Sequence, residues 1–446
     1  MTRTPKSLRL HIGIFGRTNV GKSSFLNMIA GQDVAIVSRV PGTTTDVVEK
    51  TMELLPIGPV VFLDTAGMDD TSELAGERIR KSMKIFDRSD VIAIVLEPGR
   101  WGADEEEILS EAGKRQVPVI LVVNKIDQGA PSEDYLGMLK KKCPRILPCS
   151  STDAAGRETC ITRLKQYLID VCPEEFLAPP PLVGDLLRSG TAMGLAVLVV
   201  PIDLQAPRGR LILPQVQTIR DCLDNDAAVV VVKEREYAAF LERLSTPPDI
   251  VVCDSQVVLK MVGDTPREVP CTTFSILFSR NKGDLVEAAR GAAVLGTIGP
   301  GDKILIAEAC SHHAIEDDIG RVKIPRWLRQ YAGADVQVDV SSGRDYPDNL
   351  GEYRLIIHCG GCMLTRREML ARIEQARLAG VPLTNYGVAI SALQGVIERT
   401  LSPFPAARDA YCRERDRMTA GAREAPTAGA RAPTGGAREA PTVGVR

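Results

Sequence analysis

Residues 16–23 of this 446-residue chain read Gly-Arg-Thr-Asn-Val-Gly-Lys-Ser. An apolar run, Leu10–Phe15, precedes this stretch, and a helix-like segment that begins near Ser24 follows it. A glycine loop between a strand and a helix offers backbone N–H groups and the positive end of the helix dipole to an anion. In a G-x-x-x-x-G-K-S loop the lysine, here Lys22, reaches the β- and γ-phosphates, and the serine hydroxyl, here Ser23, holds Mg²⁺. The predicted nucleotide-binding residues of this loop are Gly16, Asn19, Val20, Gly21, Lys22, Ser23 and Ser24.

Strands and helices are expected to alternate over residues 7–172. The predicted strands are Leu10–Phe15, Val60–Leu63, Val91–Leu96, Val117–Val123 and Arg145–Leu147, and the predicted helices are Ser23–Ala30, Leu74–Phe86, Asp104–Ala112 and Glu158–Leu168. This order is typical of an α/β domain with a parallel sheet covered by helices. Ligands of such domains bind at the carboxyl ends of the strands. The first domain is therefore predicted to be a P-loop domain.

Two further motifs follow predicted strands and favour a guanine nucleotide. Asp64 begins Asp-Thr-Ala-Gly and is expected to hold Mg²⁺ through water, while the N–H of Gly67 would sense the γ-phosphate. Residues 124–127 read Asn-Lys-Ile-Asp, and the carboxylate of Asp127 can accept both N–H donors of the guanine edge. Adenine presents a different donor–acceptor edge, so GTP is the expected nucleotide. The predicted base-binding residues are Asn124, Lys125, Asp127, Ser150 and Ser151, the two serines closing over the base.

The first 170 residues resemble the Era- and TrmE-type GTPases, which are related to translation factors. Thr44, within Gly-Thr-Thr-Thr-Asp, matches the Mg²⁺-binding threonine of that group's switch, and Asn19 matches the asparagine that helps to hold K⁺ in potassium-activated members. Met68 stands where Ras-like enzymes carry a water-orienting glutamine. Because an apolar side chain cannot orient water by hydrogen bonding, we expect slow, K⁺-stimulated GTP hydrolysis. The expected catalytic residues are Lys22, Thr44 and Gly67.

The rest of the chain is predicted to form two more domains and a tail. A proline-rich linker at residues 173–181 precedes a small α/β stretch, residues 182–265, in which we find no phosphate loop, acid–base pair or metal-ligand spacing. We interpret this stretch as a structural or dimerisation module. Residues 270–400 again alternate strands and helices. The tail, residues 413–446, repeats Gly-Ala-Arg-Glu-Ala-Pro-Thr and has little apolar bulk, so we expect it to be disordered.

Cysteines and histidines cluster in the predicted third domain. Three of the chain's 4 histidines lie in Cys310-Ser311-His312-His313 and His358-Cys359-Gly360-Gly361-Cys362, and each segment follows a predicted strand, Lys303–Ala309 or Arg354–Ile357. If these strands are parallel neighbours, both segments meet at one edge of the sheet. Thiolate-rich sites suit Fe–S clusters or Zn²⁺. The candidate ligands are Cys310, Cys359 and Cys362, with His312 and His358 either binding the metal or lining the pocket. A zinc site of two cysteines and two histidines and a redox dithiol of Cys359 and Cys362 remain alternatives.

The combination of an Era-like domain, a middle module and this cysteine–histidine pattern resembles the maturation GTPases of FeFe hydrogenases, the HydF family. The resemblance covers residues 7 to about 400. It implies that Cys310, Cys359 and Cys362 bind a 4Fe–4S cluster whose fourth site is exchangeable. It also implies a scaffold that carries a transient di-iron precursor to apo FeFe hydrogenase and works with the other, radical-SAM maturation enzymes. In that family the middle domain forms the homodimer. The fold class expected from it is α/β throughout, with a P-loop GTPase domain, a small dimerisation domain and an Fe–S cluster-binding domain.

Composition restricts the remaining functions. The net charge of −2 gives no strong attraction to nucleic acid or to an anionic membrane, and no apolar stretch approaches membrane-spanning length. Eleven scattered cysteines argue against a disulfide framework and for a reducing cytoplasm, and the first apolar run is too short for a signal peptide. We therefore expect a cytoplasmic protein with no nucleic-acid or membrane partner. The rival interpretations are an RNA- or ribosome-associated Era-like GTPase, which would need a basic module with aromatic residues, and a zinc-binding GTPase.

Overall fold

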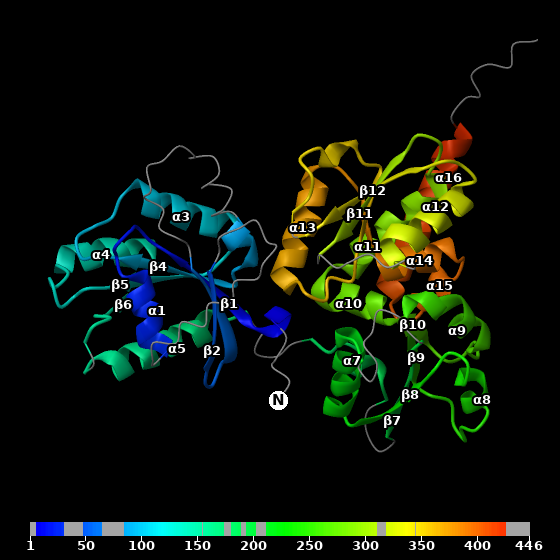
Figure 1. Cartoon of the computed structure of the whole chain (residues 1–446), viewed down its shortest axis with the longest axis horizontal. Helices are drawn as coiled ribbons and strands as arrows, with labels where there is room; N and C mark the ends of the chain where they lie inside the picture. The colour runs from blue at the N-terminus through cyan, green and yellow to red at the C-terminus, as the bar shows by residue number, and fades with distance from the viewer. Residues whose placement is uncertain are drawn as a thin grey trace, which may run out of the picture.

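The computed structural model describes residues 6–30, 48–64, 84–153, 155–173, 180–188, 193–201, 211–309, 318–343 and 345–424. Three sheets organise these residues into α/β units, as the sequence predicts (Figure 1). Five residues with predicted roles, Thr44, Gly67, Met68, Cys310 and His312, lie outside these ranges. Within them, no helix is both long enough and apolar enough to span a membrane.

The first sheet has the strand order β2-β3-β1-β4-β5-β6. Its strands are β1 (Leu10–Phe15), β2 (Val48–Leu54), β3 (Gly58–Asp64), β4 (Val91–Leu96), β5 (Val119–Val123) and β6 (Ile146–Pro148). All neighbours are parallel except β2, which runs antiparallel to β3. The five predicted strands are confirmed. The edge strand β2 was not predicted, because its charged residues at 49, 50 and 53 interrupt the apolar pattern of a buried strand.

Helices cover both faces of the first sheet, so that every residue of β1 is buried. They are α1 (Lys22–Ala30), α3 (Ala103–Lys114), α4 (Glu133–Lys142) and α5 (Arg157–Val171), and residues 84–88 are also helical. The predicted helix Leu74–Phe86 lies mostly outside the described ranges. Helix α4 was not predicted. It starts where the Ser132 hydroxyl accepts the Tyr135 N–H, and it buries only Tyr135 and Leu139.

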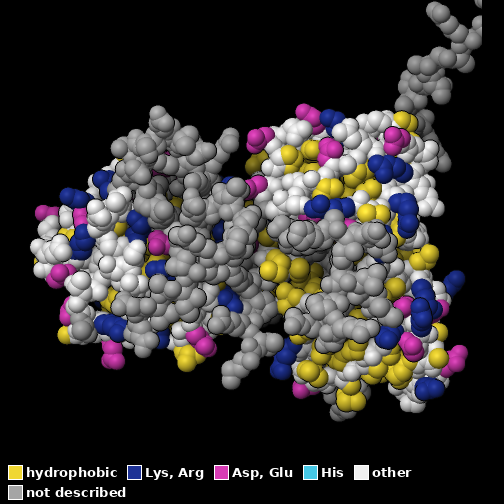
Figure 2. All heavy atoms as spheres, in the orientation of Figure 1, with side chains coloured by type: hydrophobic (Ala, Val, Ile, Leu, Met, Phe, Trp, Pro, Cys, Tyr) yellow, Lys and Arg dark blue, Asp and Glu magenta, His cyan; other side chains and the backbone are white. Residues whose placement is uncertain are grey.

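The second sheet is wholly parallel, in the order β10-β9-β7-β8. It comprises β7 (Gly194–Val199), β8 (Ala227–Val232), β9 (Ile250–Cys253) and β10 (Cys271–Thr273), with helices α7 (Leu213–Asp224), α8 (Tyr237–Leu241) and α9 (Val258–Asp264). Strand β10 lies beyond residue 265, so this sheet takes in more of the chain than the predicted middle domain. Hydrophobic side chains gather over α7 and β8 (Figure 2), including the exposed Val216, Leu223 and Val231.

The third sheet is also parallel, in the order β12-β11-β13-β14. Its strands are β11 (Lys303–Glu308), β12 (Gln337–Ser342), β13 (Leu355–His358) and β14 (Leu383–Asn385). The helices around it are α10 (Phe274–Lys282), α11 (Leu285–Ala292), α12 (Ile324–Ala332) with the π-helical turn Ile319–Lys323 before it, α13 (Arg366–Leu378), α14 (Tyr386–Leu393) and α15 (Ile397–Thr400). One hydrophobic core continues from the second sheet into the third.

A last helix, α16 (Pro405–Glu424), corrects the prediction of disorder from residue 413 onward. Ala407 and Tyr411 are buried in the core shared by the second and third sheets, so the helix is anchored there. Beyond Tyr411 the sequence lacks apolar bulk but alternates charges, and ion pairs such as Arg417–Glu414 and Arg415–Glu398 form on the helix surface. Burial of one end thus lets a weakly amphipathic segment continue as helix. Residues 425–446 lie outside the described part of the chain.

Candidate functional site

The loop between β1 and α1 has a backbone that its glycines permit. Gly16 has φ +146° and Gly21 has φ +92°. A Cβ at Gly16 would lie 2.4 Å from the Val95 carbonyl oxygen, and a Cβ at Gly21 would lie 2.3 Å from Asn124 Nδ2. Residues with side chains are therefore excluded at both positions. The buried Lys22 Nζ donates to the carbonyl oxygens of Gly16 and Arg17, at 2.7 Å each, and so crosses the loop from its helical end.

Asn124 joins this loop to the segment after β6. Its Nδ2 donates to the Val20 carbonyl oxygen at 3.0 Å. Its Oδ1 accepts from the Ser151 N–H at 3.0 Å and from the Ser151 hydroxyl at 2.8 Å. Asn124 is buried, so this residue, predicted to bind nucleotide, connects the phosphate loop and the base-binding segment from within the protein. The Ser151 hydroxyl thus takes part in this connection.

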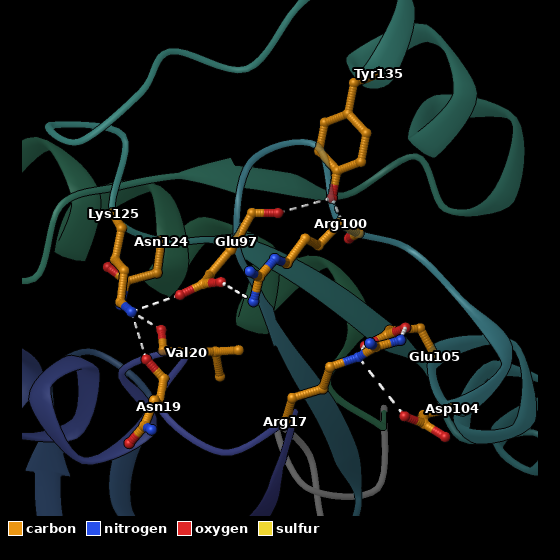
Figure 3. A network of polar contacts seen from close by, with 10 residues as sticks. All are labelled: Arg17, Asn19, Val20, Glu97, Arg100, Asp104, Glu105, Asn124, Lys125 and Tyr135. Atoms are coloured by element: carbon orange, nitrogen blue, oxygen red, sulfur yellow. Dashed lines mark hydrogen bonds and ion pairs between the residues drawn. The ribbon is translucent and has the colours of Figure 1, made fainter. Parts of the chain in front are cut away.

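Lys125 lies over the same loop (Figure 3). Its Nζ donates to the Asn19 carbonyl oxygen and to the carboxylate of Glu97, which also pairs with Arg100. Both Asn19 and Lys125 have positive φ, at 64° and 60°, a conformation that asparagine tolerates better than most residues. These contacts bring the predicted residues Asn19, Lys125 and Asn124 to one edge of the sheet.

The residues of this network that were not predicted include Arg17, Glu97 and Glu105. Arg17 donates from Nε and Nη2 to the two carboxylate oxygens of Glu105, at 2.7 and 2.8 Å, and so ties the loop to α3. The Arg17 guanidinium and the Gly102 N–H hold the pKa of Glu105 below its ordinary value, although burial alone would raise it. Glu97 directly follows β4. Its place at the carboxyl end of a central strand is the signal that could have identified it.

The two acidic residues of the predicted nucleotide site differ in their surroundings. Asp127 is exposed, and the Ser150 hydroxyl beside it lowers the pKa of its carboxyl group, which favours the ionised form that guanine recognition requires. Asp64 ends β3 and is half-buried, and burial raises its pKa while the nearby Lys50 and Lys22 oppose that shift. A divalent cation would add a stronger opposing charge at Asp64.

The cysteine loop lies at the carboxyl end of the third sheet. Strands β11 and β13 are parallel neighbours, with Ala307 opposite His358. The Cys359 N–H donates to the Ala307 carbonyl oxygen at 2.9 Å, and the Cys359 Sγ accepts from the Ala309 N–H at 3.2 Å. The strands that precede the two cysteine segments are thus parallel neighbours, which is the condition that the sequence analysis set for the segments to meet.

The loop itself turns through Gly361, whose φ is +60°. Cys359 and Cys362 are both half-buried, and burial raises the pKa of the Cys359 thiol. The described residues include no group of three or more Cys, His, Asp or Glu side chains placed to hold a metal ion. The structure therefore does not gather His358 with Cys359 and Cys362 into such a group, and Cys310 and His312 lie outside the described ranges.

His358 ends β13 and is fully buried. Burial, reinforced by the nearby Arg372, lowers its pKa to about 3, so the ring is neutral at neutral pH. Its Nδ1 lies 2.7 Å from the Cys359 carbonyl oxygen. Because a carbonyl can only accept, Nδ1 carries the proton and Nε2 keeps its lone pair.

Lys282, at the end of α10, was missed by the sequence analysis. Its side chain is buried, and Nζ donates to the carbonyl oxygens of Cys362 and Leu364 at 3.1 and 3.0 Å, with Gly361 O at 3.4 Å. Burial lowers its pKa to about 8, with Cys362 and Glu368 acting in the opposite direction. Lys282 therefore holds the backbone of the cysteine loop in place through these hydrogen bonds. Nothing in the local sequence Arg-Asn-Lys-Gly around it signals this contact.

Comparisons with known proteins divide the chain into three matched parts. Residues 11–125 match the sequence model of the 50S ribosome-binding GTPase family. Residues 182–283 match the hydrogen maturase F dimerization domain, and residues 286–403 match the hydrogen maturase F tetramerization domain.

Curated relatives resemble mainly the first part. The tRNA modification GTPase MnmE of a Picosynechococcus strain is 43% identical over 127 residues, which are 27% of this chain and 27% of the relative. MnmE of Rhizobium meliloti is 32% identical over 206 residues, 45% of this chain and 44% of the relative. The chain thus spans less than half the length of each. Among solved structures, the GTPase Era of Aquifex aeolicus bound to GDP and aluminium fluoride is 20% identical, with a TM-score of 0.31, over 50% of this chain and 91% of that chain.

Proposed function

The chain belongs to the hydrogen maturase F family, and on this premise we propose that it is a GTP-hydrolysing scaffold for an iron–sulfur cluster. In this proposal Cys310, Cys359 and Cys362 bind a 4Fe–4S cluster, and the protein assembles and delivers a di-iron precursor to apo FeFe hydrogenase. The other maturation enzymes, of the radical-SAM class, would supply the precursor.

The observation that carries the proposal is the bond from the Ala309 N–H to the Cys359 Sγ. It places Ala309, the residue before Cys310, against a thiol of the Cys-x-x-Cys loop, which supports the proposal that the three cysteines share one centre. Thiolates are the ligands of 4Fe–4S clusters, and a backbone N–H donated to a ligand sulfur is one way in which proteins tune them. When bound, a cluster with three cysteine ligands would supply one iron with an exchangeable site.

His358 is suited to a supporting role at this centre. Its Nδ1–H is donated to a backbone carbonyl, as in most metal-binding histidines, and its Nε2 has no hydrogen-bond partner within the described part of the chain. His312 and His358 are therefore proposed as pocket residues or as occupants of the exchangeable position.

The nucleotide half of the proposal assigns GTP and Mg²⁺ to the first domain. Lys22 would compensate phosphate charge, Ser23, Thr44 and Asp64 would hold Mg²⁺, and Asp127 would select guanine. Asn19 would contribute to a K⁺ site at the phosphates. With Met68 in place of a glutamine, we propose slow hydrolysis that is faster in K⁺ than in Na⁺. Equal turnover in the two salts at matched ionic strength would contradict this part.

Self-association fits the same function. The chain carries both association domains of the family. We propose a cytoplasmic homodimer formed through the middle domain, where α7 and β8 expose Val216, Leu223 and Val231. An apolar surface of this kind on an edge strand favours pairing with another chain.

The test of the cluster is iron and sulfide analysis of anaerobically purified protein, together with its absorption spectrum. Each single change Cys310→Ser, Cys359→Ser or Cys362→Ser should strongly deplete the cluster, because serine is a poor ligand for iron. GTP hydrolysis should persist, because the phosphate site is in another domain. Cys412→Ser, at a half-buried thiol on α16, is the matched control and should keep the cluster. Stoichiometric zinc without iron, or full hydrogenase activation by the ligand variants, would refute the scaffold assignment.

A further inference from the structure

One arginine joins the GTPase domain to the helix that follows the cysteine loop. Arg88 donates from Nη2 to the carboxylate of Glu49 on β2, and its Nε lies 3.4 Å from Glu368 Oε1 on α13. The three side chains are only 8–14% exposed. Figure 1 shows α13 on the side of the third sheet that faces the first domain. The Arg88 guanidinium thus lies between two largely buried carboxylates, one from each domain.

Two further contacts between these domains in the described part of the chain are polar. Arg367 Nη2 donates to the Arg115 carbonyl oxygen at 2.8 Å, and Lys84 forms an exposed ion pair with Asp345 at 2.7 Å. Polar interfaces between domains of one chain are typical of domains that move relative to one another.

From Glu368 a short path leads to the cysteine loop. Its Oε2 accepts from the N–H of Thr365, the residue that caps α13, at 2.9 Å. Thr365 follows Leu364, whose carbonyl is held with that of Cys362 by Lys282. A shift of Arg88 away from Glu368 would therefore act on a carboxylate whose other oxygen holds the backbone at Thr365.

A second short path leads from Arg88 to the nucleotide site. Its partner Glu49 lies opposite Leu63 in the β2–β3 pairing, next to the proposed Mg²⁺-associated residue Asp64. In the sequence, Glu49 follows the segment that contains Thr44, and Arg88 follows the segment that contains Gly67. A change in how the protein holds Mg²⁺ and phosphate would therefore act on both ends of the Arg88–Glu49 pair.

We propose that Arg88 couples the two sites, so that the nucleotide bound to the GTPase domain controls the accessibility of the Cys359–Cys362 loop through the Arg88–Glu368 contact. This inference deepens the proposed function and takes its biological meaning from it. Coupling between two binding sites is reciprocal. If the bound nucleotide changes the affinity of the cysteine loop for its ligand by a given factor, occupation of the loop changes the relative affinities for GDP and GTP by that factor.

The test is alkylation of the metal-free, full-length protein with iodoacetamide, in the presence of Mg²⁺ and either GDP or a non-hydrolysable GTP analogue. Mass spectrometry follows Cys359 and Cys362, with Cys412 as an internal reference. In the parent protein we expect the rates in the two nucleotides to differ by at least about fivefold, the lower range of ordinary allosteric coupling. Arg88→Met and Glu368→Gln should bring this ratio close to one while nucleotide binding persists. Glutamine still completes the capping box, so Glu368→Gln decides the matter if Arg88→Met fails to fold.

Lys84→Met is the matched control, because it removes an ion pair from the same interface without touching the path to the loop. It should keep the parent ratio. A ratio near one in the parent, an unchanged ratio in Glu368→Gln, or an equal collapse in Lys84→Met would each overturn the assignment to Arg88. The assay needs no iron, so a protein that lacks a cluster but keeps the ratio would refute the proposed function alone, and an iron-loaded protein with a ratio of one would refute the coupling alone.

Discussion

The phosphate loop and the cysteine loop are built in the same way but are recognisable to different degrees. Both leave the carboxyl end of a parallel strand, both turn through a glycine with positive φ, and each is crossed by a buried lysine that donates to its carbonyl oxygens. Lys22 belongs to its own loop, whereas Lys282 reaches Cys362 from 80 residues earlier in the chain. A sequence motif can include the lysine that holds a loop only if that lysine is close to the loop in the chain.

Replacement of Lys22 should produce the largest effect and tests the phosphate-loop half of this comparison. In Lys22→Met the phosphate charge loses its positive partner, and we expect GTP turnover to fall at least about 100-fold. Steady-state phosphate release in K⁺ measures this. Iron content should equal that of the parent, because the cysteine loop has its own lysine. A loss of iron in Lys22→Met would show that the cysteine loop depends on the phosphate loop as well as on Lys282.

Replacement of Lys282 tests the other half. Lys282→Met keeps the buried stem but leaves the carbonyls of Cys362 and Leu364 without their donor, which should lower the free energy of unfolding by about 3 kcal/mol. Cys362 should also react faster with iodoacetamide, and GTP turnover should stay at the parent value. Urea titration measures the stability. Lys303→Met, at an exposed pair with Glu352, is the control and should leave the stability at the parent value.

The buried histidines sharpen the comparison further, because each region holds one in the same neutral form. His11 on β1 shares a hydrogen bond with the Arg9 carbonyl oxygen through Nδ1, as His358 does with that of Cys359. Burial lowers the pKa of His11 to about 4, with Glu368 opposing. A folded-state pKa below the unfolded value of about 6.5 means that the unfolded chain takes up the proton first. Its stabilising contribution is therefore complete above about pH 6.5 and is lost as the pH falls toward 4.

The expected size of this effect is about 2 kcal/mol between pH 7 and pH 5, from 1.36 kcal/mol per pKa unit. Urea titrations of the parent and of His11→Gln at both pH values isolate the contribution, since glutamine can still donate to Arg9 but does not titrate. The variant should lose about that much less stability than the parent on acidification. An identical loss in both proteins would mean that folding does not shift the pKa of His11.

Most of the secondary structure followed from the sequence, and the exceptions share a cause. The buried strands β1, β4 and β5 are continuous apolar runs, so their pattern is unmistakable. Strand β2 was missed because charged residues interrupt its apolar pattern, and β10 and β14 were missed because each has only three residues. In α16 the deciding factor was the anchoring of Tyr411 in a core made by distant segments, which no local pattern in residues 413–424 reports.

The sequence by itself determined the motifs whose parts are adjacent in the chain: the phosphate loop, Asn124 to Asp127 and the Cys-x-x-Cys loop. Backbone geometry and ligand chemistry at such motifs depend on neighbours within a few residues, so their meaning survives without a fold. Only the tertiary structure decided that β11 and β13 are neighbours, that Lys282 holds the cysteine loop and that Arg88 lies between Glu49 and Glu368. Each of these contacts joins segments far apart in the chain, and a buried charge acquires its partner only when packing brings the two together.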